Sequence, residues 1–136
     1  MLICFWYEHN RSDRDEYVTI NFDNVEADNA DQFEKQRGLL DINVPYDYKS
    51  IMHYGPRDFS DNGKRTIITK DRRYQRIIGR ATGMSYLDIK TLNLAYQCAP
   101  DRCRDTVCPG DGFVDRNCQC VCDGGSDEEV LKNCGE

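Results

Sequence analysis

Side chains suited to metal or proton chemistry occur in two short stretches, at Tyr7 and His9 and again at Met52, His53 and Tyr54. A catalytic zinc ion needs three protein ligands and one position open for water. Two histidines four residues apart on a helix commonly supply two ligands, with an intervening glutamate as general base. The chain contains only two histidines, and they lie far apart in the sequence. These residues alone therefore do not compose a zinc site.

These residues lie in two stretches of sequence that resemble the motifs of a known family. The first is FWYEHNRSDRDEYV, from Phe5 to Val18, and the second is PYDYKSIMHY, from Pro45 to Tyr54. The first resembles the astacin segment that ends the zinc motif HExxHxxGFxHE and continues as RxDRDxYV. The second resembles the astacin Met-turn, PYDYxSIMHY. Over about residues 5 to 98 the chain is thus similar to the C-terminal half of an astacin-type zinc metalloendopeptidase.

The resemblance implies a role for each part of the Met-turn. Met52 corresponds to the methionine that forms an apolar floor beneath the zinc. Tyr54 corresponds to a switchable zinc ligand that leaves the metal and donates a hydrogen bond to the developing oxyanion. In the complete domain, an N-terminal lobe holds the active-site helix. An extended peptide or protein substrate binds between that lobe and this lower one.

The departures from the family motif concern the zinc ligands. Aligning Phe5, Trp6 and Glu8 with the family pattern places Cys4 at the turn glycine, Tyr7 at the third histidine and Met1 at the second. The first histidine and the catalytic glutamate would precede residue 1. A phenol with a pKa near 10 is a poor replacement for neutral imidazole. The sequence therefore predicts no zinc and no peptide hydrolysis for this chain.

Three interpretations follow from these substitutions. The favoured one is a fragment or truncated member of a secreted zinc metalloendopeptidase family. The isolated chain would then expose the surface that faces the missing lobe, and it is expected to be marginally stable or to aggregate. The alternative is a catalytically dead extracellular binding protein that uses the lower lobe and the tail. A third is a misassigned start that hides an upstream HExxH. The nucleotide sequence upstream of Met1, metal analysis and a caseinolytic assay separate them.

Other residues of the matched segments are expected to be structural. Asp13, Arg14 and Asp15 predict an ion-pair network, and Glu8 is expected to be a surface carboxylate without chemistry. In the family, the counterpart of Glu8 pairs with the amino terminus released by propeptide cleavage. The family partner of Cys98 lies in the N-terminal half, so Cys98 is expected to be unpaired unless Cys4 captures it.

The elements that must position these residues are few. The residue pattern predicts short strands over 17–22 and 66–69. Ser85 and Asp88 form a variant capping box that opens an amphipathic helix of about three turns. The expected fold class is α+β: the lower lobe of an astacin-like catalytic domain, with sparse regular structure, one C-terminal helix and a small disulfide-rich tail.

The boundary between the lobe and the tail is expected near Pro100, giving units 1–99 and 100–136. Six of the eight cysteines lie in the second unit, and their density predicts a disulfide framework in an extracellular protein. Fifteen pairings of six cysteines are open. The alternation of Cys118, Cys120 and Cys122 also suggests a metal site, although CxxC pairs are absent.

Charge and hydropathy exclude several classes of partner. The formal net charge is −6, which argues against nucleic acid. No apolar run is long enough to span a membrane, and the first residues lack the features of a signal peptide. The segment from Lys64 to Arg80 carries seven basic residues and one acid, Asp71. That segment is either a solvated face or a positive rim of a substrate cleft.

Overall fold

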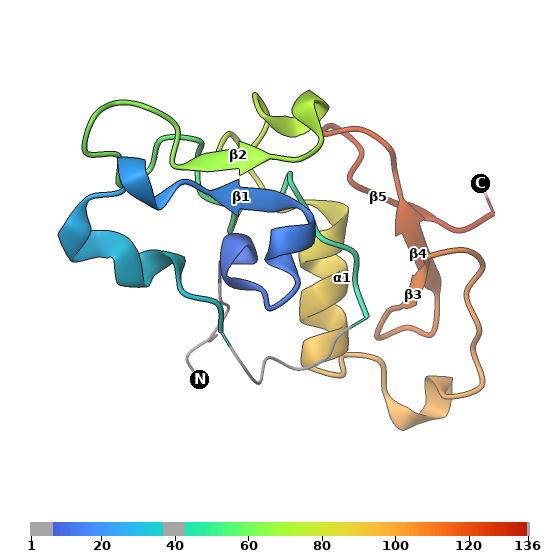
Figure 1. Cartoon of the computed structure of the whole chain (residues 1–136). Coiled ribbons are helices and arrows are strands. Elements are labelled where there is room, and N and C mark those ends of the chain that lie inside the picture. The colour runs from blue at the N-terminus through green and yellow to red at the C-terminus, as the bar shows by residue number, and fades with distance from the viewer. Residues whose placement is uncertain (1–6, 37–42, 136) are drawn as a thin grey trace. The chain divides into compact units, whose positions relative to one another are not determined.

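The computed structural model describes residues 7–36 and 43–135. These residues form two compact units (Figure 1). Unit 1 contains residues 7–36 and 45–83. Unit 2 contains residues 43–44 and 84–135. The C-terminal helix of the chain thus belongs to the same compact unit as the cysteine-rich tail, and the module boundary near Pro100 stays a prediction.

Unit 1 is organised around a two-stranded antiparallel sheet. Strand β1 (Val18–Ile20) pairs with β2 (Ile67–Thr69), and the two lie side by side in Figure 1. Both predicted strands are confirmed, in shorter form. Short 3-10 helices make up most of the remaining regular structure: η1 (Glu8–Asn10), η2 (Arg14–Glu16), η3 (Phe22–Asn24), η4 (Ala27–Phe33) and η5 (Arg72–Tyr74).

The core of unit 1 is small because a two-stranded sheet buries little surface by itself. Its buried hydrophobic residues are Val18, Val25, Phe33, Tyr46, Ile67 and Ile78. Close backbone packing supports this core at Gly79. The residue has a φ of +70°, and a Cβ built on it would lie 2.3 Å from the Cα of Gly55. Both observations require glycine at position 79.

Unit 2 begins with the predicted helix, α1 (Tyr86–Ala95). The Oγ of Ser85 accepts a hydrogen bond from the Asp88 amide at 2.9 Å, and the Asp88 carboxylate accepts one from the Ser85 amide at 3.0 Å. The variant capping box is therefore confirmed. The reciprocal bonds satisfy two amides that a helix N-terminus would otherwise leave unpaired.

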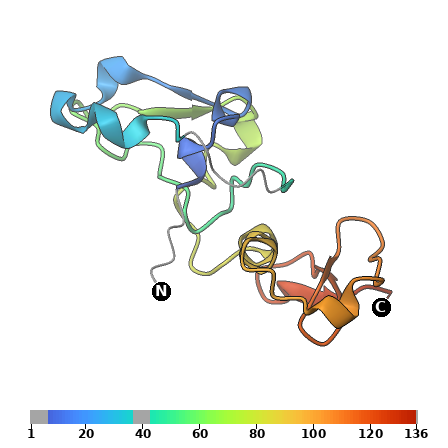
Figure 2. The same ribbon diagram turned by 90° about the horizontal axis from the view of Figure 1, so that it is seen from below.

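The tail forms a three-stranded antiparallel sheet in the order β3 (Phe113–Val114), β4 (Cys120–Asp123) and β5 (Leu131–Asn133). It follows the short η6 (Asp101–Cys103). Helix α1 contacts β3. Figure 2 shows this helix, in yellow, beside the orange and red tail. The Tyr86 hydroxyl donates to the Asp111 carbonyl at 2.7 Å. That bond fixes the start of α1 to the turn before β3.

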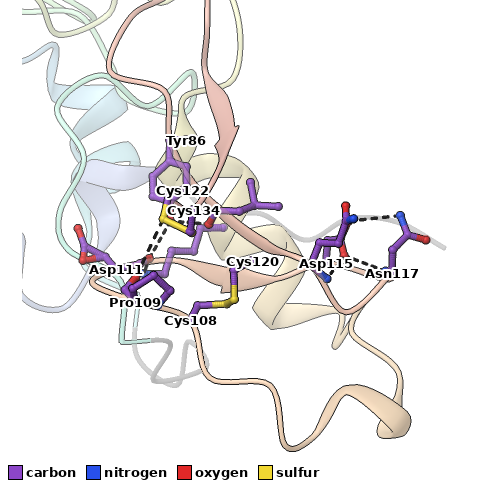
Figure 3. The surroundings of a disulfide bond; sticks show 12 residues. Tyr86, Cys108, Pro109, Asp111, Asp115, Asn117, Cys120, Cys122 and Cys134 are labelled. Carbon is purple, nitrogen blue, oxygen red and sulfur yellow. Dashed lines mark hydrogen bonds between the residues drawn. A yellow bond between two sulfur atoms is a disulfide. The ribbon is translucent and has the colours of Figure 1, made fainter. Parts of the chain in front are cut away.

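Three disulfides cross-link the tail: Cys103–Cys118, Cys108–Cys120 and Cys122–Cys134. Figure 3 shows the two that involve β4, together with Tyr86. The structure thus selects one of the fifteen pairings and confirms the disulfide framework. The metal interpretation of Cys118, Cys120 and Cys122 is wrong, because each of these sulfurs is bonded to another cysteine. Across residues 7–36 and 43–135, no helix is long and apolar enough to cross a membrane.

Candidate active site

The Met-turn is a tight turn held by its own polar groups. The His53 amide donates to the Ser50 carbonyl at 3.1 Å, and the Met52 amide donates to the Ser50 Oγ at 3.0 Å. The Glu8 amide donates to the Met52 carbonyl at 3.0 Å. That last bond joins the two stretches that resemble the family motifs. The structure therefore brings Tyr7, which aligns with the third histidine of the family motif, beside the Met-turn.

Two tyrosines meet at this point. The rings of Tyr7 and Tyr54 lie 4.6 Å apart between centroids, and 40% of Tyr7 is exposed. Burial raises the pKa of Tyr54 to about 12, and the adjacent Tyr7 adds to the increase. Tyr54 is therefore a protonated phenol at neutral pH. A protonated phenol donates a hydrogen bond well but binds a metal ion poorly.

His53 is a structural residue of the Met-turn. It is buried, its Nδ1 lies 2.7 Å from the Tyr54 carbonyl oxygen, and its Nε2 lies 2.7 Å from the Tyr46 hydroxyl. A carbonyl only accepts, so Nδ1 carries the proton and Nε2 accepts from Tyr46. Burial lowers the pKa of His53 to about 4. Both nitrogens are committed, which leaves none for a metal.

The sequence does not reveal the environment of His9. Its side chain is 0% exposed, and its ring lies 3.9 Å from that of Tyr54 and 5.8 Å from that of Phe33. Neither ring nitrogen has a hydrogen-bond partner among the described residues. The backbone of Gln32 favours the charged form, yet burial and His53 outweigh it and lower the pKa of His9 to about 3. His9 is thus a neutral aromatic core residue.

These donors do not fit a catalytic zinc ion. Tyr7 and Tyr54 offer phenols, His53 is fully hydrogen-bonded, and His9 is closed to solvent. No group of three His, Cys, Asp or Glu side chains within residues 7–36 and 43–135 could hold a metal. Cys4 and Met1, which align with the turn glycine and the second histidine, lie outside the described residues.

Glu8 holds the Met-turn segment in place. Its Oε1 accepts hydrogen bonds from the Asp47 amide at 2.8 Å and from Arg11 at 3.1 Å. Burial raises the pKa of Glu8 to about 7, although these donors act in the opposite direction. The interpretation of Glu8 as a surface carboxylate is therefore wrong. The side chain fastens η1 to the start of the Met-turn.

The predicted ion pairing of Asp13, Arg14 and Asp15 is present in part. Arg14 pairs with Asp15 at 2.9 Å, whereas Asp13 pairs with Arg11 at 2.7 Å. Arg14 is buried and also donates to the carbonyl oxygens of His9 and Phe33. A charged group pays a large desolvation cost unless it is paired and hydrogen-bonded, and Arg14 meets both conditions. This network ties η1 to the end of η4.

The structure does not test the roles expected of Met52 and Tyr54. Met52 is half-buried, and its role beneath a metal stays a prediction. Cys98 is an exposed free thiol, whereas Cys4 lies outside the described residues. The role of Tyr54 as an oxyanion donor also stays a prediction.

Comparison with known proteins assigns this site to a family. The family model for astacin, a family of peptidases, matches residues 2–97. The chain is 40% identical over 124 residues to Protein SpAN of Strongylocentrotus purpuratus, covering 88% of this chain and 20% of that protein. It is 45% identical over 98 residues to zinc metalloproteinase nas-6 of Caenorhabditis elegans, covering 71% of this chain and 28% of that protein.

A solved structure agrees with these matches. High choriolytic enzyme 1, a hatching enzyme zinc-protease from the medaka fish Oryzias latipes, superposes with a TM-score of 0.64 at 42% identity. The match covers 70% of this chain and 47% of that one. The chain belongs to the astacin family, and its α+β fold is that of the lower lobe. It spans 20% to 28% of the length of the two curated relatives above.

Proposed function

We propose that this chain is a zinc-free lower lobe of an astacin-type peptidase domain, and that it hydrolyses no peptide bond. In the complete protein, such a lobe forms one wall of the cleft for an extended peptide or protein substrate. The proposal is carried by Tyr7, which aligns with the third histidine of the family motif and whose ring lies against that of Tyr54. The family's metal chemistry needs imidazole where this chain has a phenol.

A phenol must lose its proton before it binds zinc strongly. At pH 7, a phenol with a pKa near 10 costs about 4 kcal/mol to ionise, since each pKa unit corresponds to about 1.4 kcal/mol. Burial makes the ionisation of Tyr54 harder still. Neutral imidazole binds zinc without any such cost. A pair of phenols is therefore a much weaker donor set than the histidines of the family motif.

The test uses the 136-residue chain with its disulfides intact. The chain is incubated with equimolar zinc, dialysed, and measured for bound metal by mass spectrometry and for casein hydrolysis with and without a chelator. We expect less than one tenth of an equivalent of zinc and no chelator-sensitive hydrolysis. One tightly held zinc per molecule with chelator-sensitive activity would refute the proposal.

The tail supports an extracellular location for this lobe. Three disulfides cross-link a segment with little buried hydrophobic surface, and such bonds persist in oxidising compartments. The alternative function, an extracellular binding protein without catalysis, stays a prediction. This alternative would be favoured if the chain cleaved no peptide and yet co-eluted with a peptide from a size-exclusion column.

A further inference from the structure

Positive charge is concentrated in one segment of unit 1. Residues 64–80 carry seven basic residues and one acidic residue, a net charge of +6, within a chain whose net charge is −6. The other 119 residues therefore carry a net charge of −12. Such local segregation of charge creates a positive potential that the net charge of the protein does not reveal.

All seven basic side chains of this segment are exposed. Arg73 pairs with Asp71 at 2.6 Å. The other six form no ion pair with any residue that the structure describes. We call these six residues the basic strip: Lys64, Arg65, Lys70, Arg72, Arg76 and Arg80. Their charges are free to meet an external anion.

The backbone beneath the basic strip is fixed by hydrogen bonds on both edges of β2. One edge pairs with β1. On the other edge, the Gln75 side chain accepts from the Thr69 amide at 3.0 Å and donates to the Ile67 carbonyl at 3.1 Å. The side-chain amide of Gln75 thus takes the place of a neighbouring strand. Figure 1 shows the chain running from β2 directly into this following segment.

Two further contacts anchor the segment after β2. The Tyr74 ring stacks on Tyr48 with a centroid separation of 4.3 Å, and Ile78 is 0% exposed in the core. Arg72 and Arg76 lie on either side of Tyr74 in the sequence. Charges carried on a fixed backbone lose less conformational freedom on binding than charges on a mobile loop. The backbone that carries Lys70, Arg72 and Arg76 is therefore fixed before a ligand binds.

We infer that the basic strip binds a sulfated polysaccharide. Four of its six residues are arginines, whose planar guanidinium groups bind sulfate-like oxyanions through two parallel hydrogen bonds. Proteins that bind single-stranded nucleic acids also supply aromatic rings on which the bases stack. Tyr74 is the aromatic residue of the segment, and its ring is already stacked on Tyr48. A disulfide-bonded protein also meets sulfated polysaccharides outside the cell.

The experiment measures binding of the full chain to a heparin oligosaccharide by calorimetry at several salt concentrations. Binding of a linear polyanion releases condensed counterions, so log K falls linearly with log salt. Six contacts predict a slope of about −4 to −5. The variant Arg72→Gln/Arg76→Gln should have a slope shallower by about 1.5 and an affinity about tenfold lower near 0.1 M salt.

The matched control removes the same charge from unit 2. Arg116 and Lys132 are exposed and lie outside the strip, so Arg116→Gln/Lys132→Gln should keep the heparin affinity within about twofold. An equal loss in both double variants would refute the assignment to the strip. Equal binding of desulfated heparin or of polyglutamate would refute the sulfate chemistry. A third outcome would also overturn the inference: the chain binds no heparin but self-associates, and Arg72→Gln/Arg76→Gln abolishes that self-association. The partner would then be a second copy of the chain.

Discussion

Mild acid should destabilise unit 1 through its two buried histidines. His9 and His53 have pKa values lowered from 6.5 to about 3 and about 4, mainly by burial. A histidine with a depressed folded pKa stays neutral in the native state while its unfolded counterpart binds a proton. The stability it contributes is present above pH 6.5 and is lost as the pH falls below that value. Both histidines contribute to this loss between pH 6.5 and pH 5.

The expected magnitude follows from proton linkage. Over this interval both histidines stay neutral in the folded protein, whereas the unfolded chain becomes almost fully protonated at these positions. Each histidine therefore removes about 1 to 2 kcal/mol of unfolding free energy, and the two together remove about 3 kcal/mol. That is a large fraction of the stability of a small unit.

Glu8 acts in the opposite direction. Its pKa is raised from 4.5 to about 7, so the folded state holds a proton that the unfolded state has released. Its contribution to stability grows as the pH falls from 7 to 4.5. Between pH 6.5 and pH 5 it restores about 1 to 2 kcal/mol. The wild-type chain should therefore lose about 1 to 2 kcal/mol overall.

The assay is urea unfolding, followed by near-ultraviolet circular dichroism of the tyrosines, at pH 6.5 and pH 5. His9→Phe keeps a planar ring and removes one titrating group, so its stability should change little between the two pH values. Glu8→Gln removes the opposing group, so its loss should increase to about 3 kcal/mol. The comparison concerns the change with pH within each variant, and a constant cost of repacking does not affect it.

Two results would refute this reasoning. One is a His9→Phe variant that loses as much stability as the wild type between pH 6.5 and pH 5. The other is a ring proton resonance of His9 that titrates near pH 6.5 in the folded protein. Either result would place His9 in contact with water, contrary to its buried position.

Other perturbations have equally definite outcomes. Ser85→Ala should lower the urea midpoint of unit 2 by an amount equivalent to about 1 kcal/mol, because the helix loses its cap. Gly79→Ala should lower the unfolding free energy by about 3 kcal/mol or more through a backbone clash. Gly63 has positive φ but open space around it, so Gly63→Ala should lower the unfolding free energy by about 1 kcal/mol. Cys108→Ser/Cys120→Ser should lower the thermal midpoint by an amount equivalent to about 3 kcal/mol. A variant of Gly79 as stable as that of Gly63 would contradict the close packing.

Local features of this protein were readable in the sequence. The capping box at Ser85 and Asp88 depends on residues three positions apart, so its outcome required no tertiary information. The strands 17–22 and 66–69 were also placed correctly, although the structure shortens both. The matched stretches located Tyr7 and Tyr54, and the resemblance brought them to one site.

Contacts between distant segments could not be predicted from the sequence. The sequence predicts a surface carboxylate at Glu8, yet the Asp47 amide and partial burial give it a structural role. No periodicity signals the enclosure of His9, because Phe33 and Tyr54 reach it from separate segments. The same limit applies to Gln75, whose side chain completes the edge of β2 only after the chain turns back.

The sequence by itself determined the family, the helix cap and the segregation of charge, because these depend on residue type and short spacing. The tertiary structure decided the disulfide pairing, the neutral state of the two histidines and the support beneath the basic strip. Those properties depend on burial and on hydrogen bonds between residues far apart in the chain, and folding alone brings such residues together.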